Sequence, residues 1–125
     1  MKQYEVWLIK AEHDLASALR LSAGDDPILD TAIYHTQQCA EKALKAYLSF
    51  KKHPIEKTHD IEFLVELCAD IDDSFNSLLD DAKVLTPYDT AFRYPDINID
   101  PDKTDVLDAI EKAKKVLDYV REKIT

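Results

Sequence analysis

The chain has 125 residues, of which 46% are hydrophobic and 33% are charged, and its formal net charge is −9. A chain of this length can bury one hydrophobic core, so we expect a single helical domain over residues 1–125. Its acidic balance argues against non-specific binding to DNA, because such binding depends on neutralising backbone phosphates. The presence of only one glycine disfavours folds rich in β-hairpins and favours long helices with short connections.

Apolar residues recur at helical spacing in the first part of the chain and predict two long helices. The first covers residues 3–22. The second covers residues 28–51, with Asp26 as its N-cap and Pro27 in its first turn. Its apolar face spans more than half of its circumference. We therefore expect it to be the central helix, buried on more than one side and able to reach an oligomer interface.

The remaining segments also read as helices. The second helix should end before Pro54, and Thr58 should cap a third helix. A fourth helix should begin near Ser74, and a short helical turn should open at Thr86. The last helix covers residues 103–124, with apolar spacing suited to long antiparallel neighbours. The predicted fold is all-α, an antiparallel up-and-down bundle of four to five helices plus a short helical turn.

Charge is unevenly distributed along this acidic chain. Residues 31–59 carry five lysines and two acids, a net of +3, whereas residues 60–108 carry three basic residues and fourteen acids, a net of −11. Basic and amide side chains spaced three or four apart fall on one side of the second helix. This face could be an ordinary solvated surface. Its mixture of residue types on a central helix instead favours directed hydrogen bonds to an anion. The residues of this face are His35, Gln38, Lys42 and Lys45.

Three further residues could serve such a site. Asp14 falls at the edge of the first helix's apolar stripe, where a partly buried acid needs a cation. It could form a salt bridge with Lys42 or Lys45, or it could orient a basic site. His59 either belongs to a simple capped helix start or donates to an anion there. Arg93 either pairs with a nearby acid or forms a fork for phosphate or carboxylate.

No local motif for catalysis or for a cofactor is present. The chain has no glycine-rich phosphate loop, nucleophile elbow or HExxH sequence. Cys39 and Cys68 fall on apolar helix faces and are interpreted as reduced core thiols, so no metal site is expected. No segment approaches the roughly 20 apolar residues that span a membrane, and we expect a cytoplasmic protein.

Four short segments of the chain, in order, resemble the HEPN domain family, a helical family found in higher eukaryotes and prokaryotes in nucleotide-binding contexts. The resemblance covers nearly the whole chain. The segments are Trp7-x-x-x-Ala11-x-x-Asp14-Leu15-x-x-Ala18, Ala32-x-x-His35-x-x-Gln38-x-Ala40-Glu41-Lys42-Ala43-Leu44-Lys45-Ala46, Thr58-His59-Asp60-Ile61 and Arg93-Tyr94-Pro95.

The resemblance implies an all-α bundle, usually a homodimer, encoded beside a minimal nucleotidyltransferase and paired with it. Many members are metal-independent RNases with an Arg followed by a His roughly four to six residues later. In this chain Arg20, Arg93 and Arg121 have no histidine at that distance downstream. This disfavours endoribonuclease activity.

We therefore predict a subunit that binds a nucleotide or another anion, with a phosphate-bearing ligand as the expected type. The subunit should form a homodimer and should partner a minimal nucleotidyltransferase in a toxin–antitoxin-like pair. The alternatives are a metal-independent endoribonuclease and a scaffold without a ligand. The predicted ligand-binding residues are His35, Gln38, Lys42, Lys45, His59, Arg93 and Tyr94, with Asp14 as an orienting acid.

Overall fold

A computed structural model describes residues 1–94 and 100–124, and within these residues every regular element is a helix. The all-α prediction is therefore confirmed. Among the described residues no helix is both long and apolar enough to cross a membrane. The elements are α1 (Gln3–Ser22), α2 (Leu29–Phe50), α3 (Ile61–Ile71), the 3₁₀ segment η1 (Asp73–Leu78), α4 (Leu79–Leu85), the 3₁₀ segment η2 (Thr86–Asp89) and α5 (Lys103–Ile124).

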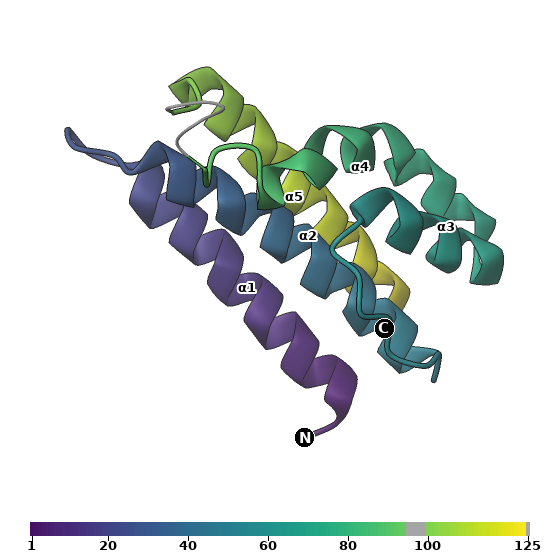
Figure 1. Ribbon diagram of the computed structural model, residues 1–125. Helices are drawn as coiled ribbons and strands as arrows, with labels where there is room; N and C mark the ends of the chain where they lie inside the picture. The colour runs from purple at the N-terminus through teal and green to yellow at the C-terminus, as the bar shows by residue number, and fades with distance from the viewer. Residues whose placement is uncertain (95–99, 125) are drawn as a thin grey trace.

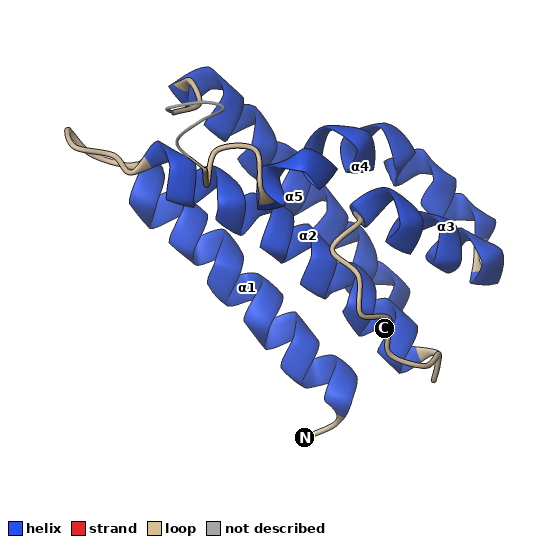
Figure 2. Cartoon of the chain, in the orientation of Figure 1, coloured by secondary structure: helices blue, strands red, loops and turns tan. Residues whose placement is uncertain are grey.

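Three long helices, α1, α2 and α5, lie side by side and form most of the bundle (Figure 1). The shorter α3 and α4 form an antiparallel pair that packs on α2 and α5. α1 runs antiparallel to α2, whereas α5 runs alongside α2 in the same direction. Between α2 and α3 the chain forms the loop of residues 51–60, which turns back along α2 (Figure 2). This return places the start of α3 beside the middle of α2.

α2 is the central helix, as its wide apolar face predicted. Twelve of its 22 residues are buried, and it packs against α1, α3 and α5. Small side chains with no exposed surface, such as Ala40 and Ala43, let the neighbouring helices approach closely. Because α2 is central, some of its polar residues are also buried against neighbouring parts of the chain.

An aromatic chain ties α2 to η1 and α5. The ring of Phe75 lies 4.4 Å from that of Tyr47 and 5.1 Å from that of Tyr119, measured between centroids. The Tyr119 hydroxyl donates to Ser74 Oγ at 2.6 Å, so this polar atom is satisfied. These contacts fix the end of the bundle opposite the α1–α2 connection.

The predicted span of the second helix is close to the observed one, but its predicted N-cap, Asp26, is wrong. α2 begins at Leu29, with Ile28 as an N-cap that makes no side-chain hydrogen bond. Asp26 and Pro27 precede the helix. The backbone N–H of Ile28 donates to Leu21 O at 2.8 Å, so the connection is tied to the end of α1 and the helix starts after that bond.

The start of α3 also differs from the prediction, since Asp60 is the cap and Thr58 is not. The Asp60 side chain accepts a hydrogen bond from Phe63 N at 3.2 Å. Thr58 Oγ1 accepts from Asp60 N at 3.1 Å, so it shapes the turn that presents the cap. The predicted helical start near Ser74 is confirmed, although it is a 3₁₀ turn whose N–H at Ser74 is capped by Asp72.

Candidate functional site

Two buried carboxylates organise the polar side of α2. Asp14 projects from α1 and is 7% exposed, and Glu41 belongs to α2 itself and is 4% exposed. A buried carboxylate is costly unless cations and hydrogen-bond donors surround it. Each of these two carboxylates binds one lysine and one histidine.

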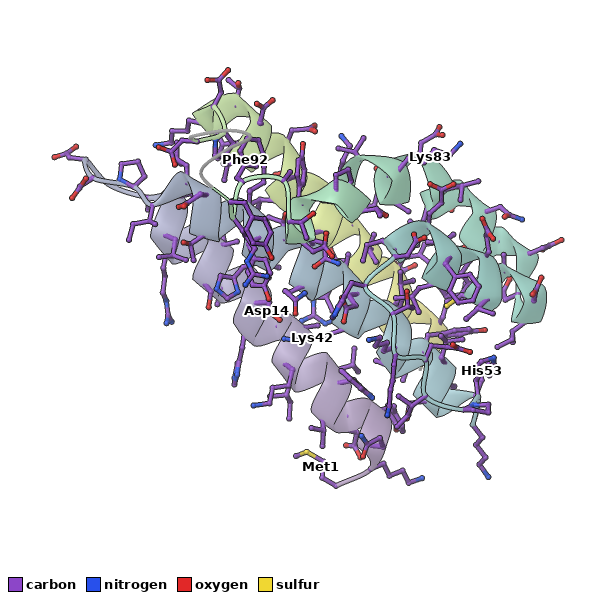
Figure 3. The ribbon with its side chains drawn as sticks, in the orientation of Figure 1. Met1, Asp14, Lys42, His53, Lys83 and Phe92 are labelled. Carbon is purple, nitrogen blue, oxygen red and sulfur yellow. The ribbon has the colours of Figure 1, made fainter. Side chains whose placement is uncertain are left out.

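The Asp14 cluster consists of Asp14, His35 and Lys42. Lys42 Nζ lies 2.7 Å from Asp14 Oδ2, and His35 Nδ1 lies 2.8 Å from Asp14 Oδ1. Asp14 and Lys42 lie close together between α1 and α2 (Figure 3). The predicted contact between Asp14 and a lysine of the second helix is confirmed, with Lys42 as the partner.

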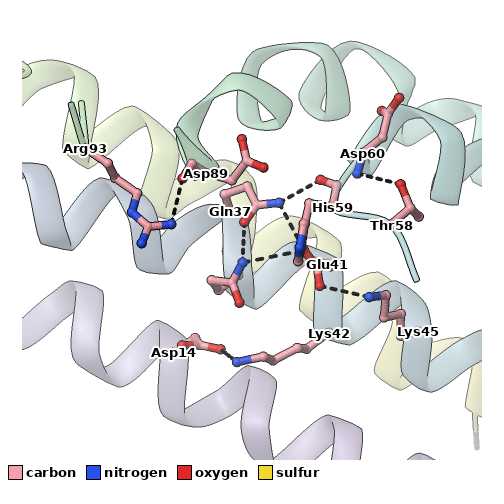
Figure 4. Close-up of polar contacts among 11 residues, drawn as sticks. Asp14, Gln37, Glu41, Lys42, Lys45, Thr58, His59, Asp60, Asp89 and Arg93 are labelled. Carbon is pink, nitrogen blue, oxygen red and sulfur yellow. Dashed lines mark hydrogen bonds and ion pairs between the residues drawn. The ribbon is translucent and has the colours of Figure 1, made fainter. Parts of the chain in front are cut away.

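The Glu41 cluster consists of Glu41, Gln37, Gln38, Lys45 and His59. Lys45 Nζ lies 2.9 Å from Glu41 Oε2, and His59 Nδ1 lies 2.8 Å from Glu41 Oε1 (Figure 4). The amide nitrogens of Gln37 and Gln38 also donate to Glu41 Oε1, at 3.2 and 3.5 Å. Lys45 therefore serves Glu41, and not Asp14 as one of the two sequence-based options had it.

These contacts change how the basic stripe of α2 should be understood. The side chains of Lys42 and Lys45 are only 25% and 10% exposed, and both ammonium groups point at carboxylates. Each lysine thus balances a buried acid. Neither presents a free positive charge at the surface.

The two histidines are held in the same way. An ionised carboxylate can only accept a hydrogen bond, so Nδ1 of His35 and of His59 must carry the proton. That leaves Nε2 of each ring as the atom that can accept or donate a proton. The His59 side chain is 69% exposed and that of His35 is 26% exposed, so both rings can be reached from solvent.

Arg93 lies near both histidines without joining either cluster. Its guanidinium carbon lies 4.7 Å from the centroid of the Tyr34 ring, a cation–π contact. Its Nη1 donates to the backbone carbonyl of Asp89 at 3.3 Å (Figure 4). Within residues 1–94 and 100–124 no carboxylate forms an ion pair with it, and the hydrogen bond to Asp89 is the guanidinium's one bond to that part of the chain.

Two hollows share Arg93 and Tyr34 as walls. The first encloses about 470 Å³, part of it open to solvent, and includes His35. The second encloses about 330 Å³, also partly open, and includes Gln38 and His59. The other lining residues are Asp30 and Thr31 in the first hollow, and Asp89 and Thr90 in the second.

The structure thus brings some of the predicted site residues together and separates others. His35, Gln38, His59 and Arg93 border these adjoining hollows. Lys45 borders a different hollow, beside Trp7. The other predicted residues do not line the two hollows: Lys42 and Asp14 lie in the Asp14 cluster, and Tyr94 is 52% exposed. Of the Arg93-Tyr94-Pro95 segment, Pro95 lies outside the described residues.

Sequence reasoning missed Glu41, Gln37 and Tyr34. In the sequence, Glu41 and Gln37 look like ordinary polar residues of a helix. In the structure, His59 of the loop of residues 51–60 contacts both of them. Gln37 is fully buried, and its Nε2 donates to the backbone carbonyl of His59 at 2.8 Å. In the described part of the chain, no group of three or more His, Cys, Asp or Glu residues is arranged to hold a metal.

Comparisons with known proteins agree with this fold. The sequence matches the HEPN domain over residues 4–123. The crystal structure of an archaeal HEPN homologue is similar over all of both chains, at 29% identity and a TM-score of 0.77. The crystal structure of TT1696 from Thermus thermophilus is similar at 30% identity and a TM-score of 0.81, over 98% of this chain and 99% of that one. A search of curated proteins finds no match.

Proposed function

Because this chain belongs to the HEPN domain family, we propose that it is a helical subunit that binds a nucleotide or another phosphate-bearing ligand beside Arg93. The binding surface consists of the two hollows that share Arg93 and Tyr34. His35 lines one hollow and His59 lines the other.

The observation that supports this proposal is the state of the Arg93 guanidinium. It is held in place by the Tyr34 ring and one carbonyl oxygen, and it forms no ion pair within the described residues. A guanidinium fixed by stacking presents its remaining N–H groups as a fork, which suits the oxygens of a phosphate. Because Arg93 lines both hollows, its guanidinium can contact a ligand in either one.

The buried ion pairs support the same function. Asp14 with Lys42, and Glu41 with Lys45, are each neutral as pairs. Each pair holds one histidine through Nδ1, which leaves Nε2 of that ring available to hydrogen-bond a ligand.

Two acids border the hollows and limit which ligands fit. Asp30 Oδ1 already accepts a hydrogen bond from the backbone N–H of Thr31 at 2.8 Å. Asp89 accepts a hydrogen bond from Arg93 through its backbone carbonyl, and it also lines the second hollow. A ligand with hydroxyl or amine donors beside its phosphate suits this rim better than a bare anion does.

Calorimetry with inorganic phosphate, AMP and ATP tests the proposal. Hydrogen bonds to charged groups contribute about 1.5–3 kcal/mol, so Arg93→Ala should weaken binding by about tenfold or more. Lys83→Ala, which removes one positive charge from α4, is the matched control and should bind like the wild type. Affinity should fall as salt is added. Unchanged affinity in Arg93→Ala would remove Arg93 from the site and refute the proposal.

As part of this proposal, the protein forms a homodimer and partners a minimal nucleotidyltransferase in a toxin–antitoxin-like pair. Support comes from the family resemblance and from apolar side chains left half exposed near the α1–α2 connection, Leu19 and Ile28. Co-expression with a minimal nucleotidyltransferase from the same genome, followed by size-exclusion chromatography, should give one complex. Separate elution of the two proteins would contradict the pairing.

One observation favours a second candidate function, a metal-independent endoribonuclease. Two histidines held by carboxylates lie on either side of an arginine, and such groups can move protons and stabilise phosphate charge. An RNase assay on highly purified protein with a chelator present tests it. Cleavage that is lost in His35→Gln or His59→Gln would make this function the better one, and absence of cleavage would reject it.

A further inference from the structure

A chain of hydrogen bonds fixes the orientation of the Gln38 amide. The backbone carbonyl of His59 can only accept, so the Gln37 atom 2.8 Å from it must be the amide nitrogen (Figure 4). The Gln37 oxygen therefore points the other way, where it accepts from Gln38 Nε2 at 2.7 Å. Gln38 Oε1 is the polar atom of the Gln38 side chain that this chain of hydrogen bonds does not use.

Glu41 enforces the same orientation. Its Oε1 accepts from Gln37 Nε2 at 3.2 Å and from Gln38 Nε2 at 3.5 Å, as well as from His59 Nδ1 at 2.8 Å. A flip of either amide would place an oxygen against this carboxylate and break the bond between the two glutamines. Because Gln37 is fully buried and Glu41 is 4% exposed, water cannot easily replace those bonds.

Gln38 lines the second hollow together with Tyr34, His59 and Arg93. Within residues 1–94 and 100–124 the hydrogen bonds of the Gln38 side chain both run through Nε2, and Oε1 accepts none. This hollow is small and partly open to solvent, so it suits one portion of a nucleotide.

We infer that this hollow selects ligands that carry a hydrogen-bond donor next to their phosphate, with Gln38 as the residue that determines specificity and Gln37 as the residue that positions it. The donor is a sugar hydroxyl or a base amine of a nucleotide. This inference rests on the proposed function, since it names which ligands the same surface prefers. A fixed acceptor rejects an analogue without the donor, because that acceptor then loses water and gains no partner.

Calorimetry with matched adenine nucleotides tests the inference. The probes are AMP, 2′-deoxy-AMP, 3′-deoxy-AMP, purine riboside 5′-monophosphate and inorganic phosphate. Wild-type protein should bind AMP roughly tenfold more tightly than the one analogue that lacks the recognised donor. That analogue identifies the donor as the 2′-hydroxyl, the 3′-hydroxyl or the 6-amino group.

Substitutions of the glutamines separate recognition from folding. Gln38→Leu should bind AMP and the discriminated analogue equally. Gln37→Met keeps the length of a buried side chain but frees the Gln38 amide, so it should narrow the discrimination. Gln3→Leu, at the exposed start of α1, is the matched control and should keep the wild-type ratio. A purely structural defect would weaken all probes alike and leave the ratio unchanged, and circular dichroism checks the fold of each variant.

The outcomes distinguish this inference from the proposed function. If phosphate and nucleotides bind but the wild type treats AMP and all three analogues alike, the inference is overturned and the proposed function stands. If Gln38→Leu keeps the wild-type ratio, Gln38 is not the specificity residue. If no probe binds at all, both are overturned.

Discussion

Lys45→Met is the substitution that probes the buried charge network most sharply. The side chains of Lys45 and Glu41 are 10% and 5% exposed, and their charged atoms lie 2.9 Å apart. Methionine keeps most of the apolar stem of lysine, so packing is largely preserved while the charge is removed. Glu41 is then left buried without its lysine, although His59 and the two glutamines still donate to it.

The expected cost follows from that arrangement. Breaking a buried ion pair on one side costs about 3–5 kcal/mol, because a charge stays buried without its counter-ion. The three remaining donors place the Lys45→Met variant at the low end, about 3 kcal/mol. With roughly 3 °C lost per kcal/mol in a chain of this length, the unfolding midpoint should fall by about 9 °C.

The matched control is Lys112→Met on α5. Lys112 also pairs with an acid four residues away, at 2.8 Å from Asp108, but the Asp108 side chain is 55% exposed. Exposed pairs of this type contribute about 0.3–0.5 kcal/mol, so the midpoint should move by only about 1–2 °C. Thermal unfolding followed by circular dichroism measures both variants. Equal small shifts would show that Glu41 is solvated and would refute the reasoning.

Three further predictions concern the thiols, one acid and the oligomeric state. Burial raises the pKa of Cys39 and Cys68 to about 12, so a thiol reagent at pH 8 should label neither in the folded protein and both after denaturation; labelling of the native protein would contradict their burial. Hydrogen bonds from Ser74, helped by Lys123, lower the pKa of Asp72 to about 2 from its ordinary 3.8. Because the pKa of Asp72 is lower in the folded protein than in the unfolded chain, the ionised carboxylate stabilises the fold above about pH 4, and this stabilisation is lost as the pH falls towards 2. In Asp72→Asn the unfolding midpoint should therefore decrease less between about pH 4 and pH 2 than it does in the wild type. Equal slopes in the two proteins would be evidence against that role. Sedimentation at micromolar concentration should give twice the 14.3 kDa of the chain, and a monomer would argue against the homodimer.

The helices could be predicted closely from the sequence because apolar periodicity depends on the burial of one face. The spans 3–22 and 103–124 agree with α1 and α5 as observed. The first residues of the helices could not be predicted as well, because capping depends on the contacts of the connection that precedes each helix. Asp26 is a good capping residue, but Ile28 is tied to the end of α1 and α2 begins after it.

The site could be predicted only where a single helix face decided the outcome. Asp14 lies at the edge of an apolar helix face, which predicted a cationic partner on α2, and Lys42 is that partner. The burial of Glu41 was not visible, because it depends on the loop of residues 51–60 folding back over α2. The same loop supplies His59, whose carbonyl and ring both contact residues of α2. Contacts of this kind arise from tertiary structure and leave no periodic trace in the sequence.

A titration of the four histidines by NMR tests the central claim most directly. The chain has His13, His35, His53 and His59, and only His35 and His59 line the two hollows beside Arg93. On addition of AMP or inorganic phosphate, the ring resonances of His35 and His59 should shift while those of His13 and His53 stay in place. Shifts of His13 and His53 without His35 and His59, or no shift of any histidine, would contradict a phosphate-binding surface at Arg93.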